Sequence, residues 1–408
     1  MFNSKFSRRQ FLKTSAAVAA LPTLSALNSV SFAATGQADH TVINVFLRGG
    51  MDSLSALIPY TEQAYFDARP TIAIPEAGRT VLNEQFALHH ALSPLQALYD
   101  QGDLAFVVAA GLGAKVTTRS HFSAQRIMES GSDDTTQADG WLGRYLAANN
   151  ETSAIFRGVG MGEIPKSLRG YNAALGLPKL SGFGIKARGV NSAKVPDSLR
   201  RLYAHIEHPL LANQATQTLT ALDVAASNAL GSVAKPAAYG NSKEGDALHQ
   251  VAELLNADIG LEAANVDIKG WDMHSDMGHW SNGELSMRFS NLSRALVAFY
   301  DEISAHRSKV TIIVTSEFGR RVAENNSGGA DHGKGGAMMV LGSGIAGGQV
   351  YGDWPGLAPE NLNRGDLQVT TDHRQVLSEI IERRLGRPDL LSAVLPDYTP
   401  EGYLGICG

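Results

Sequence analysis

Carboxylates and histidines that could bind a metal gather in residues 311–342. The stretch opens with a β-branched run, 311–315, which is typical of a buried strand in a parallel sheet. Glu317 follows this run directly, and a glycine-rich loop then delivers Asp331 and His332 before a second apolar run. Open α/β sheets bind ligands beyond the carboxyl ends of their strands. The stretch therefore predicts a metal site there, although ordinary polar residues capping a glycine-rich turn would give the same pattern.

Two other places in the chain repeat this combination of a strand end and a metal-binding side chain. Residues 41–47 predict a first strand, and Asp52 lies just past its end, after two glycines. Asp272 and His274 lie in the ligand-rich stretch GWDMHSDMGH. Because parallel strands end at one edge of a sheet, we expect these side chains to meet. The predicted metal ligands are Asp52, Asp272, His274, Glu317 and His332. Their mixture of imidazole and carboxylate favours Zn²⁺ or Mn²⁺ over Ca²⁺ or Mg²⁺.

Ser120 and His121 are the candidate catalytic residues. They fall where a predicted helix begins, at 121–130, and Gly131 ends that helix. The backbone N–H groups and the dipole at a helix N-terminus favour an anion. Ser120 could therefore be a nucleophile beside a metal, or it could simply cap the helix. His121 could equally be an ordinary surface or core histidine.

Arginines near these loops could hold an anionic substrate, or they could pair with local acids. The candidates are Arg48, Arg119 and Arg320. A small anionic ester would suit such a set.

Predicted strands and helices alternate along the chain. Residues 103–109 predict a second strand, residues 246–265 a helix, and residues 283–306 a long helix whose apolar positions recur at helical spacing. This alternation predicts an α/β fold with a largely parallel sheet. We expect residues 34–408 to form a single domain, with an insertion or cap at 151–245, where the pattern is irregular.

Composition excludes some classes of partner. The chain has 408 residues, 44% of them hydrophobic, which is enough for a sizeable core. Its net charge is −5; leaving out the four basic residues among 1–33 leaves 31 Lys and Arg against 40 Asp and Glu, or −9. A net-acidic chain gives no support to nucleic-acid binding or to attachment to anionic lipid.

The N-terminus is predicted to be an export signal. Residues 7–13, SRRQFLK, match the twin-arginine motif, an alanine-rich apolar run follows, and Ser31-Phe32-Ala33 suits signal peptidase. Residues 1–33 are therefore expected to direct the chain through the twin-arginine machinery to the periplasm or the medium. No apolar run of 18 or more residues lies elsewhere, so no stable membrane insertion is expected. Cys407 is the single cysteine, so the chain can form no internal disulfide.

Taken together, these motifs resemble the bacterial family called domain of unknown function 1501 (DUF1501), which is grouped with the alkaline phosphatase and sulfatase superfamily. The resemblance is carried by the twin-arginine leader and by LRGGMDSL, RSHFSAQRIMESG, GWDMHSDMG, TSEFGR, DHGKGGAMMVLG and GGQVYGDWPGL. It implies an alkaline-phosphatase-like three-layer α/β/α sandwich with a metal centre at the carboxyl ends of the strands. It also implies metal-binding roles for Asp52, Asp272, His274 and His332.

The sequence departs from the superfamily pattern at two positions. Phe318 stands where a metal-binding histidine would be, which puts a two-metal centre in doubt. His121 falls at the nucleophile position, and Ser120 is one residue away. Despite these departures, the set of metal-binding residues and the resemblance together predict an exported metal-dependent hydrolase of phosphate or sulfate esters. The alternative is a non-catalytic periplasmic protein that binds metal or carbohydrate on the same fold.

Overall fold

The structure, a computed structural model, describes residues 38–113, 115–149, 153–185 and 194–407. The predicted signal at 1–33 lies outside the described residues. Among the residues inside these ranges, no helix has both the length and the apolar character needed to cross a membrane.

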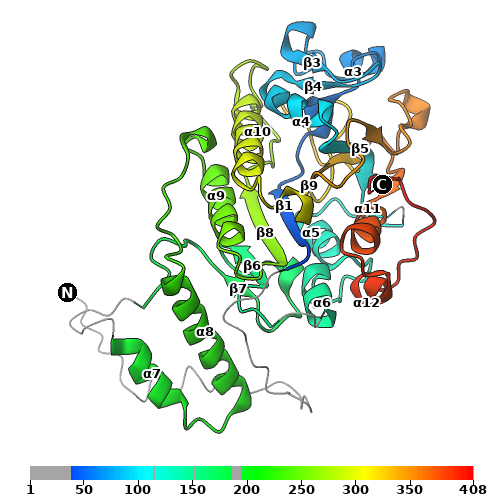
Figure 1. Ribbon diagram of the computed structural model, residues 1–408. Coiled ribbons are helices and arrows are strands. Elements are labelled where there is room, and N and C mark those ends of the chain that lie inside the picture. The colour runs from blue at the N-terminus through cyan, green and yellow to red at the C-terminus, as the bar shows by residue number, and fades with distance from the viewer. Residues whose placement is uncertain (1–37, 114, 150–152, 186–193, 408) are drawn as a thin grey trace, which may run out of the picture.

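One large sheet forms the middle layer of the molecule (Figure 1). Its strand order is β11-β5-β10-β9-β1-β8-β6-β7, and β12 also pairs with β5. β1 (Thr41–Arg48) runs parallel to both of its neighbours, β8 (Ala263–Lys269) and β9 (Val310–Thr315). β10 (Gly336–Leu341) runs antiparallel to its own neighbours, β9 and β5 (Leu104–Gly111). The prediction of a largely parallel sheet is confirmed.

Shorter strands complete the sheet and form a second, small one. The main sheet also contains β6 (Gly158–Met161), β7 (Leu175–Gly176), β11 (Val350–Tyr351) and β12 (Thr371–Asp372). The small sheet joins β2 (Leu57–Ile58), β4 (Ala87–His89) and β3 (Arg79–Val81).

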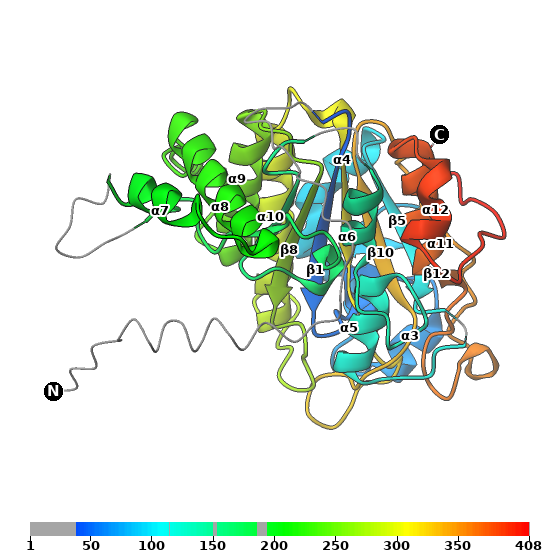
Figure 2. The same ribbon diagram turned by 90° about the horizontal axis from the view of Figure 1, so that it is seen from below.

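Helices cover both faces of the main sheet, which makes three layers (Figures 1 and 2). α9 (Lys243–Asn256) and α10 (Glu284–Glu302) pack on one face. α5 (His121–Ser130), α6 (Trp141–Ala148) and α11 (His373–Glu379) pack on the other. The predicted α/β/α sandwich is confirmed, and the predicted helix at 121–130 has the bounds of α5.

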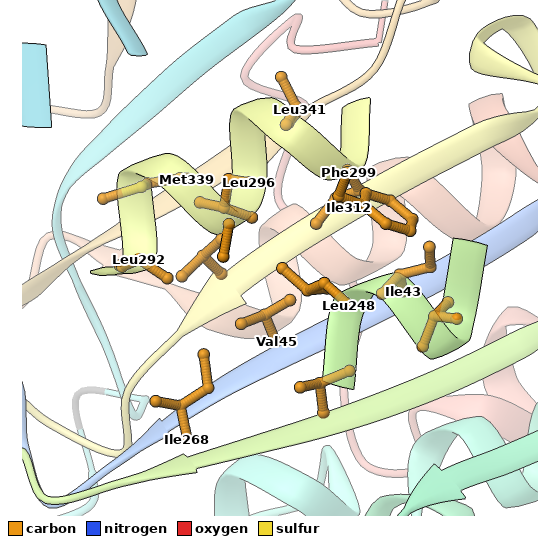
Figure 3. Close-up of a cluster of buried hydrophobic side chains, with 14 of the residues drawn as sticks. Ile43, Val45, Leu248, Ile268, Leu292, Leu296, Phe299, Ile312, Met339 and Leu341 are labelled. Carbon is orange, nitrogen blue, oxygen red and sulfur yellow. The ribbon is translucent and has the colours of Figure 1, made fainter. Parts of the chain in front are cut away.

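Successive side chains of β1 point to opposite faces of the sheet, so this strand contributes to the apolar core on each side. Ile43 and Val45 point toward α9 and α10, where they meet Leu248, Leu296 and Phe299 (Figure 3). Burying an aliphatic or aromatic side chain of this size stabilises the fold by about 1.5–3 kcal/mol. The apolar side chains of the strands thus pack the sheet against its helices, and the polar residues that follow them lie at the strand ends.

The remaining helices are short or peripheral. They are α2 (Ser53–Ala56), α3 (Gln63–Ala68), α4 (Gln96–Asp100), α7 (Val195–Tyr203), α8 (Pro209–Ser227), a π-helical turn (Ile380–Arg384) and α12 (Leu391–Val394).

The expected helix over 246–265 is wrong in its second half. α9 ends at Asn256, and β8 begins at Ala263. Asp258 and Gly260 have positive φ angles of 51° and 82°, which end the helix and turn the chain back into the sheet. The sequence of β8, AANVDIK, is only weakly apolar. Its polar residues are tolerated inside the sheet because they are paired there, as where Asn44 of β1 donates to the Asn265 side chain at 2.7 Å.

The segment expected to form a cap has two parts. Its first part contributes β6 and β7 to the edge of the main sheet. α7 and α8 then pack together beside α9, and α7 has no buried residue (Figures 1 and 2). The division into a single domain with a cap stays a prediction.

Candidate metal centre

Side chains from three separate parts of the chain meet at one edge of the main sheet. Parallel strands β1, β8 and β9 end there, and antiparallel β10 begins there. His121 is the first residue of α5, Asp272 follows β8, and His332 precedes β10. One potential ligand atom from each of these residues lies within 4.8 Å of the other two.

His274 joins this group. Its Nε2 lies 3.1 Å from Oδ1 of Asp272 and 2.8 Å from Nε2 of His332. Oδ1 of Asp272 also lies 3.2 Å from Nε2 of His332 and 3.3 Å from Nε2 of His121. Three imidazole nitrogens therefore surround one carboxylate oxygen. We call His121, Asp272, His274 and His332 the histidine–aspartate cluster.

The opposite nitrogen of each imidazole is held by an oxygen. Nδ1 of His332 lies 2.7 Å from the Arg119 carbonyl, which can only accept, so Nδ1 carries the proton. Nδ1 of His121 lies 2.7 Å from Oε1 of Glu317, and Nδ1 of His274 lies 3.0 Å from Oδ1 of Asp331. When Nδ1 donates to these oxygens, each Nε2 presents its lone pair to the cluster. This is the usual arrangement around metal-binding histidines.

Two of the three oxygens that hold the imidazoles belong to carboxylates, Glu317 and Asp331, and both are ionised. Burial raises the pKa of Glu317, but hydrogen bonds from Gln125 and other donors outweigh it and keep that pKa below its usual value. Hydrogen bonds from His274 and Asn325 lower the pKa of Asp331. Both carboxylates are therefore acceptors at neutral pH.

Asp272 and His332 are in the unprotonated forms that bind a cation. Partial burial would raise the pKa of Asp272, but the hydrogen bond and charge of Arg320 outweigh it and lower that pKa to about 2. Burial lowers the pKa of His332 below its usual value, so its Nε2 stays unprotonated near neutrality.

The residues fit a divalent metal. Nε2 of His121 is a buried polar atom without a hydrogen-bond partner in the described part of the chain. The Nε2 lone pairs of His274 and His332 face each other at 2.8 Å, a contact that needs a proton or a cation between them. Donor atoms of a tetrahedral zinc site, with bonds of about 2.0 Å, lie roughly 3.3 Å apart. The separations of 2.8–3.3 Å in the cluster are of this size.

Two residues predicted as ligands are engaged differently. Both oxygens of buried Asp52 are bonded to the buried guanidinium of Arg69, at 2.6 and 3.0 Å. Glu317, also buried, accepts from His121, Gln125 and the Gly49 N–H. The structure thus brings Asp272, His274 and His332 together with His121, and leaves Asp52 and Glu317 around them with other partners.

Phe318, Gly49 and Gly50, which stood out in the sequence, pack closely against the cluster. Phe318 is buried, and its ring centroid lies 4.9 Å from that of His121 and 4.8 Å from that of His332. A side chain on Gly50, where φ is 68°, would begin 2.5 Å from the Phe318 ring. On Gly49, where φ is 125°, it would begin 2.3 Å from the backbone nitrogen of Asp272. Glycine at both positions lets the loop approach closely enough to place Asp272.

Ser120 is the exposed N-cap residue of α5. Its side chain makes no capping hydrogen bond, and its neighbour Arg119 supplies the carbonyl that holds His332. Ser120 is therefore the direct neighbour of His121, a member of the cluster, and of Arg119, which contacts His332. Its role as a nucleophile stays a prediction.

The three candidate arginines have different surroundings. Arg48 pairs with Glu129 at 3.0 Å and Asp267 at 2.8 Å. Arg320 is buried, and donates to Asp272 at 2.7 Å and to the carbonyls of nearby loops. Arg119 keeps 36% of its side chain exposed and pairs with Asp366.

Two supporting residues carry little signal in the sequence. Arg69 lies in an unremarkable stretch after α3, and its pairing with Asp52 depends on the folded arrangement of these loops. Gln125 lies one helical turn after His121, and that spacing could have placed it on the same face of α5.

Comparison with known proteins bears on two segments of the chain. Residues 196–394 match the model described as "Protein of unknown function (DUF1501)". This segment is thus similar to the DUF1501 family. Residues 5–25 match the twin-arginine translocation pathway signal sequence. The chain is thus exported by the twin-arginine machinery, and its destination is the periplasm or the medium.

The DUF1501 match contains Asp272, His274 and His332, while His121 lies before it. The search of curated proteins found no match to this chain.

Solved structures give only distant similarities. The PsFucS1 sulfatase from Pseudoalteromonas sp. is 11% identical with a TM-score of 0.33, over 76% of this chain and 64% of that one. The zinc complex of the C-terminal periplasmic domain of EcEptC from Escherichia coli is 9% identical with a TM-score of 0.33, over 79% and 78%. The alkaline phosphatase from the Antarctic bacterium TAB5 is 11% identical with a TM-score of 0.29, over 76% and 94%. TM-scores this low leave the fold and the activity to be argued from this chain's own residues.

Proposed function

We propose that this exported protein is a metal-dependent hydrolase of phosphate or sulfate esters, with the histidine–aspartate cluster as its metal site. The observation that carries the proposal is the convergence of three imidazole Nε2 atoms on Asp272 Oδ1, with every Nδ1 held from behind by an oxygen. Imidazole with carboxylate favours Zn²⁺ or Mn²⁺. When bound, such an ion would supply Lewis-acid stabilisation of charge developing on an ester oxygen.

The chain's own residues would then orient the substrate. The N-terminus of α5 points its free backbone N–H groups at the region of Ser120 and His121, and these favour an anionic group. The Ser120 hydroxyl, which is exposed and not used as a cap, is the candidate nucleophile. Arg320 would hold Asp272 rather than the substrate, because its side chain is buried against the loops.

We further propose one metal ion per chain. Asp52 and Glu317, the other two predicted ligands, would support the site without binding the ion. The fixed positive charge of Arg69 already neutralises Asp52, since a guanidinium stays protonated in proteins. Phe318 fills the space beside His121 and His332 with an aromatic ring, which offers no ligand atom.

A second candidate function is metal or carbohydrate binding without turnover. One observation favours it: among the described residues, no side chain that could act as a base is hydrogen-bonded to the Ser120 hydroxyl. A serine without such a base is a weak nucleophile unless a metal activates it.

Turnover by the mature protein decides between the two. Protein loaded with Zn²⁺ or Mn²⁺ would be tested against aryl phosphate, phosphodiester and aryl sulfate. We expect hydrolysis of at least one ester class, abolished in Asp272→Ala. Ser120→Ala should lose activity while retaining metal if Ser120 attacks. If metal-replete protein hydrolyses none of these esters, the binding function is the better account.

A further inference from the structure

A buried carboxylate and two half-exposed arginines lie next to the histidine–aspartate cluster. Asp366 is fully buried, with 0% of its side chain exposed. One of its oxygens accepts from Arg119, and the other lies 3.6 Å from Nε of Arg321. The arginines come from different loops, so Asp366 brings together two guanidinium groups that are distant in sequence.

These guanidinium groups still face solvent. Arg119 and Arg321 keep 36% and 39% of their side chains exposed. Beyond the contacts with Asp366, the described residues supply one further hydrogen bond, from Arg321 to the Arg364 carbonyl at 2.5 Å. A guanidinium carries five N–H donors, so most of the donors in this pair have no hydrogen-bond partner among the described residues. Arg320, one residue from Arg321, is by contrast buried and bonded to surrounding loops.

Positive charge exceeds negative charge around Asp366. Burial raises the pKa of this acid, while Arg119, Arg321 and Lys334 all act on it as cations in the opposite direction. Arg321 also acts on the carboxylate of Asp331, so three cations face two carboxylates here. Such an excess is unfavourable unless water or an anion balances it.

The arginine pair is tied to the metal ligands through the backbone. The carbonyl of Arg119 accepts from Nδ1 of His332 at 2.7 Å, and the N–H of Arg321 donates to the carbonyl of Asp331 at 2.9 Å. Arg119 therefore contacts the cluster directly, and Arg321 contacts it through Asp331, whose side chain holds Nδ1 of His274, so an anion held by both would lie at its rim.

From this geometry we infer that Arg119 and Arg321, joined by Asp366, form an anion-binding subsite for a phosphate or sulfate group at the rim of the cluster. The subsite deepens the proposed function and rests on it only for its link to catalysis. Two guanidinium groups with free N–H pairs bind such oxyanions in fork geometry. The substrate would then present its negative oxygens to the arginines, while its ester oxygen faces the histidines and Asp272.

Anion binding can be measured without turnover. Mature protein, as purified and again after metal removal, would be titrated calorimetrically with inorganic phosphate and with inorganic sulfate. The buffer should be of low ionic strength, since salt screens exposed charges. We expect one site that remains after metal removal. Each charge-assisted hydrogen bond lost should weaken binding about tenfold to a hundredfold, in Arg119→Ala and in Arg321→Ala.

Arg200 provides a matched control. It is 39% exposed and pairs with Asp197 and Asp223 on the peripheral helices, so Arg200→Ala removes a similar charge far from the cluster. Unchanged binding in this variant, together with unchanged melting temperatures in all three, would support the subsite. Equal weakening in all three variants, or anion binding that survives both rim substitutions, would overturn it.

The two proposals fail separately. Arginine-dependent phosphate or sulfate binding without ester hydrolysis would support the subsite and overturn the catalytic function. Ester hydrolysis together with anion binding that is unchanged in Arg119→Ala and in Arg321→Ala would support the catalytic function and overturn the subsite. Comparing the phosphate and sulfate titrations shows which oxyanion the subsite prefers.

Discussion

Glu317 provides a specific test of how the site is held together. Its Oε1 lies 2.7 Å from Nδ1 of His121, and it also accepts from Gln125 and the Gly49 N–H. We predict that Glu317→Gln, which keeps the shape and removes the charge, weakens metal binding without removing a metal ligand. The neutral amide would no longer favour the Nδ1-protonated form of His121, so the Nε2 lone pair would be a poorer donor.

The expected magnitude follows from the loss of one supporting contact. Replacing such a partner typically costs tenfold to a hundredfold in metal affinity. This corresponds to about 1.4–2.8 kcal/mol of binding free energy. Zn²⁺ affinity would be measured by competition with a chromogenic chelator, and the melting temperature would establish that the fold is intact.

Glu129→Gln is the matched control for this experiment. Glu129 is a buried carboxylate of the same helix region, but it pairs with Arg48 at 3.0 Å rather than with a histidine. We expect its Zn²⁺ affinity to equal that of the wild type. The reasoning would be refuted if Glu317→Gln bound Zn²⁺ as tightly as the wild type, or if both variants lost the same affinity.

Three other perturbations test separate parts of the account. Arg69→Met strands the buried carboxylate of Asp52 and should lower the free energy of unfolding in urea by about 3–5 kcal/mol; unchanged stability would show that the pair is not needed. Because burial lowers the pKa of His332 below that of an ordinary histidine, metal should be retained on dialysis at neutral pH and released only in more acidic solution, where His332 becomes protonated. Metal retention that does not change at any acidic pH would argue against a histidine site. Replacing both Arg8 and Arg9 with Lys should leave uncleaved precursor in the cytoplasm, detected by fractionation and immunoblotting; normal export would count against the twin-arginine signal.

Local patterns in the sequence predicted the framework of the site well. The β-branched run before Glu317 and the capped helix beginning at His121 are both present, because apolar periodicity and glycine stop signals act over short distances. β8 was missed because its alanines and paired asparagine hide a buried central strand. Asp258 and Gly260 were the local signals that could have divided helix from strand.

The partners of the site residues could not be predicted in the same way. That Arg69 neutralises Asp52, or that Glu317 supports His121 from behind, depends on which loops the sheet brings together. A carboxylate after a strand has the same sequence signature whether it binds a metal, an arginine or an imidazole. The catalytic role expected for His121 stays a prediction, and its Nε2 lies 3.3 Å from Oδ1 of Asp272.

Metal content tests the central claim most directly. Mature protein would be saturated with Zn²⁺, desalted and analysed by inductively coupled plasma mass spectrometry. We predict one ion per chain in the wild type and in Asp52→Asn, and none in Asp272→Ala or His332→Ala. A wild type without bound metal would contradict the account, as would a second ion that is lost in Asp52→Asn.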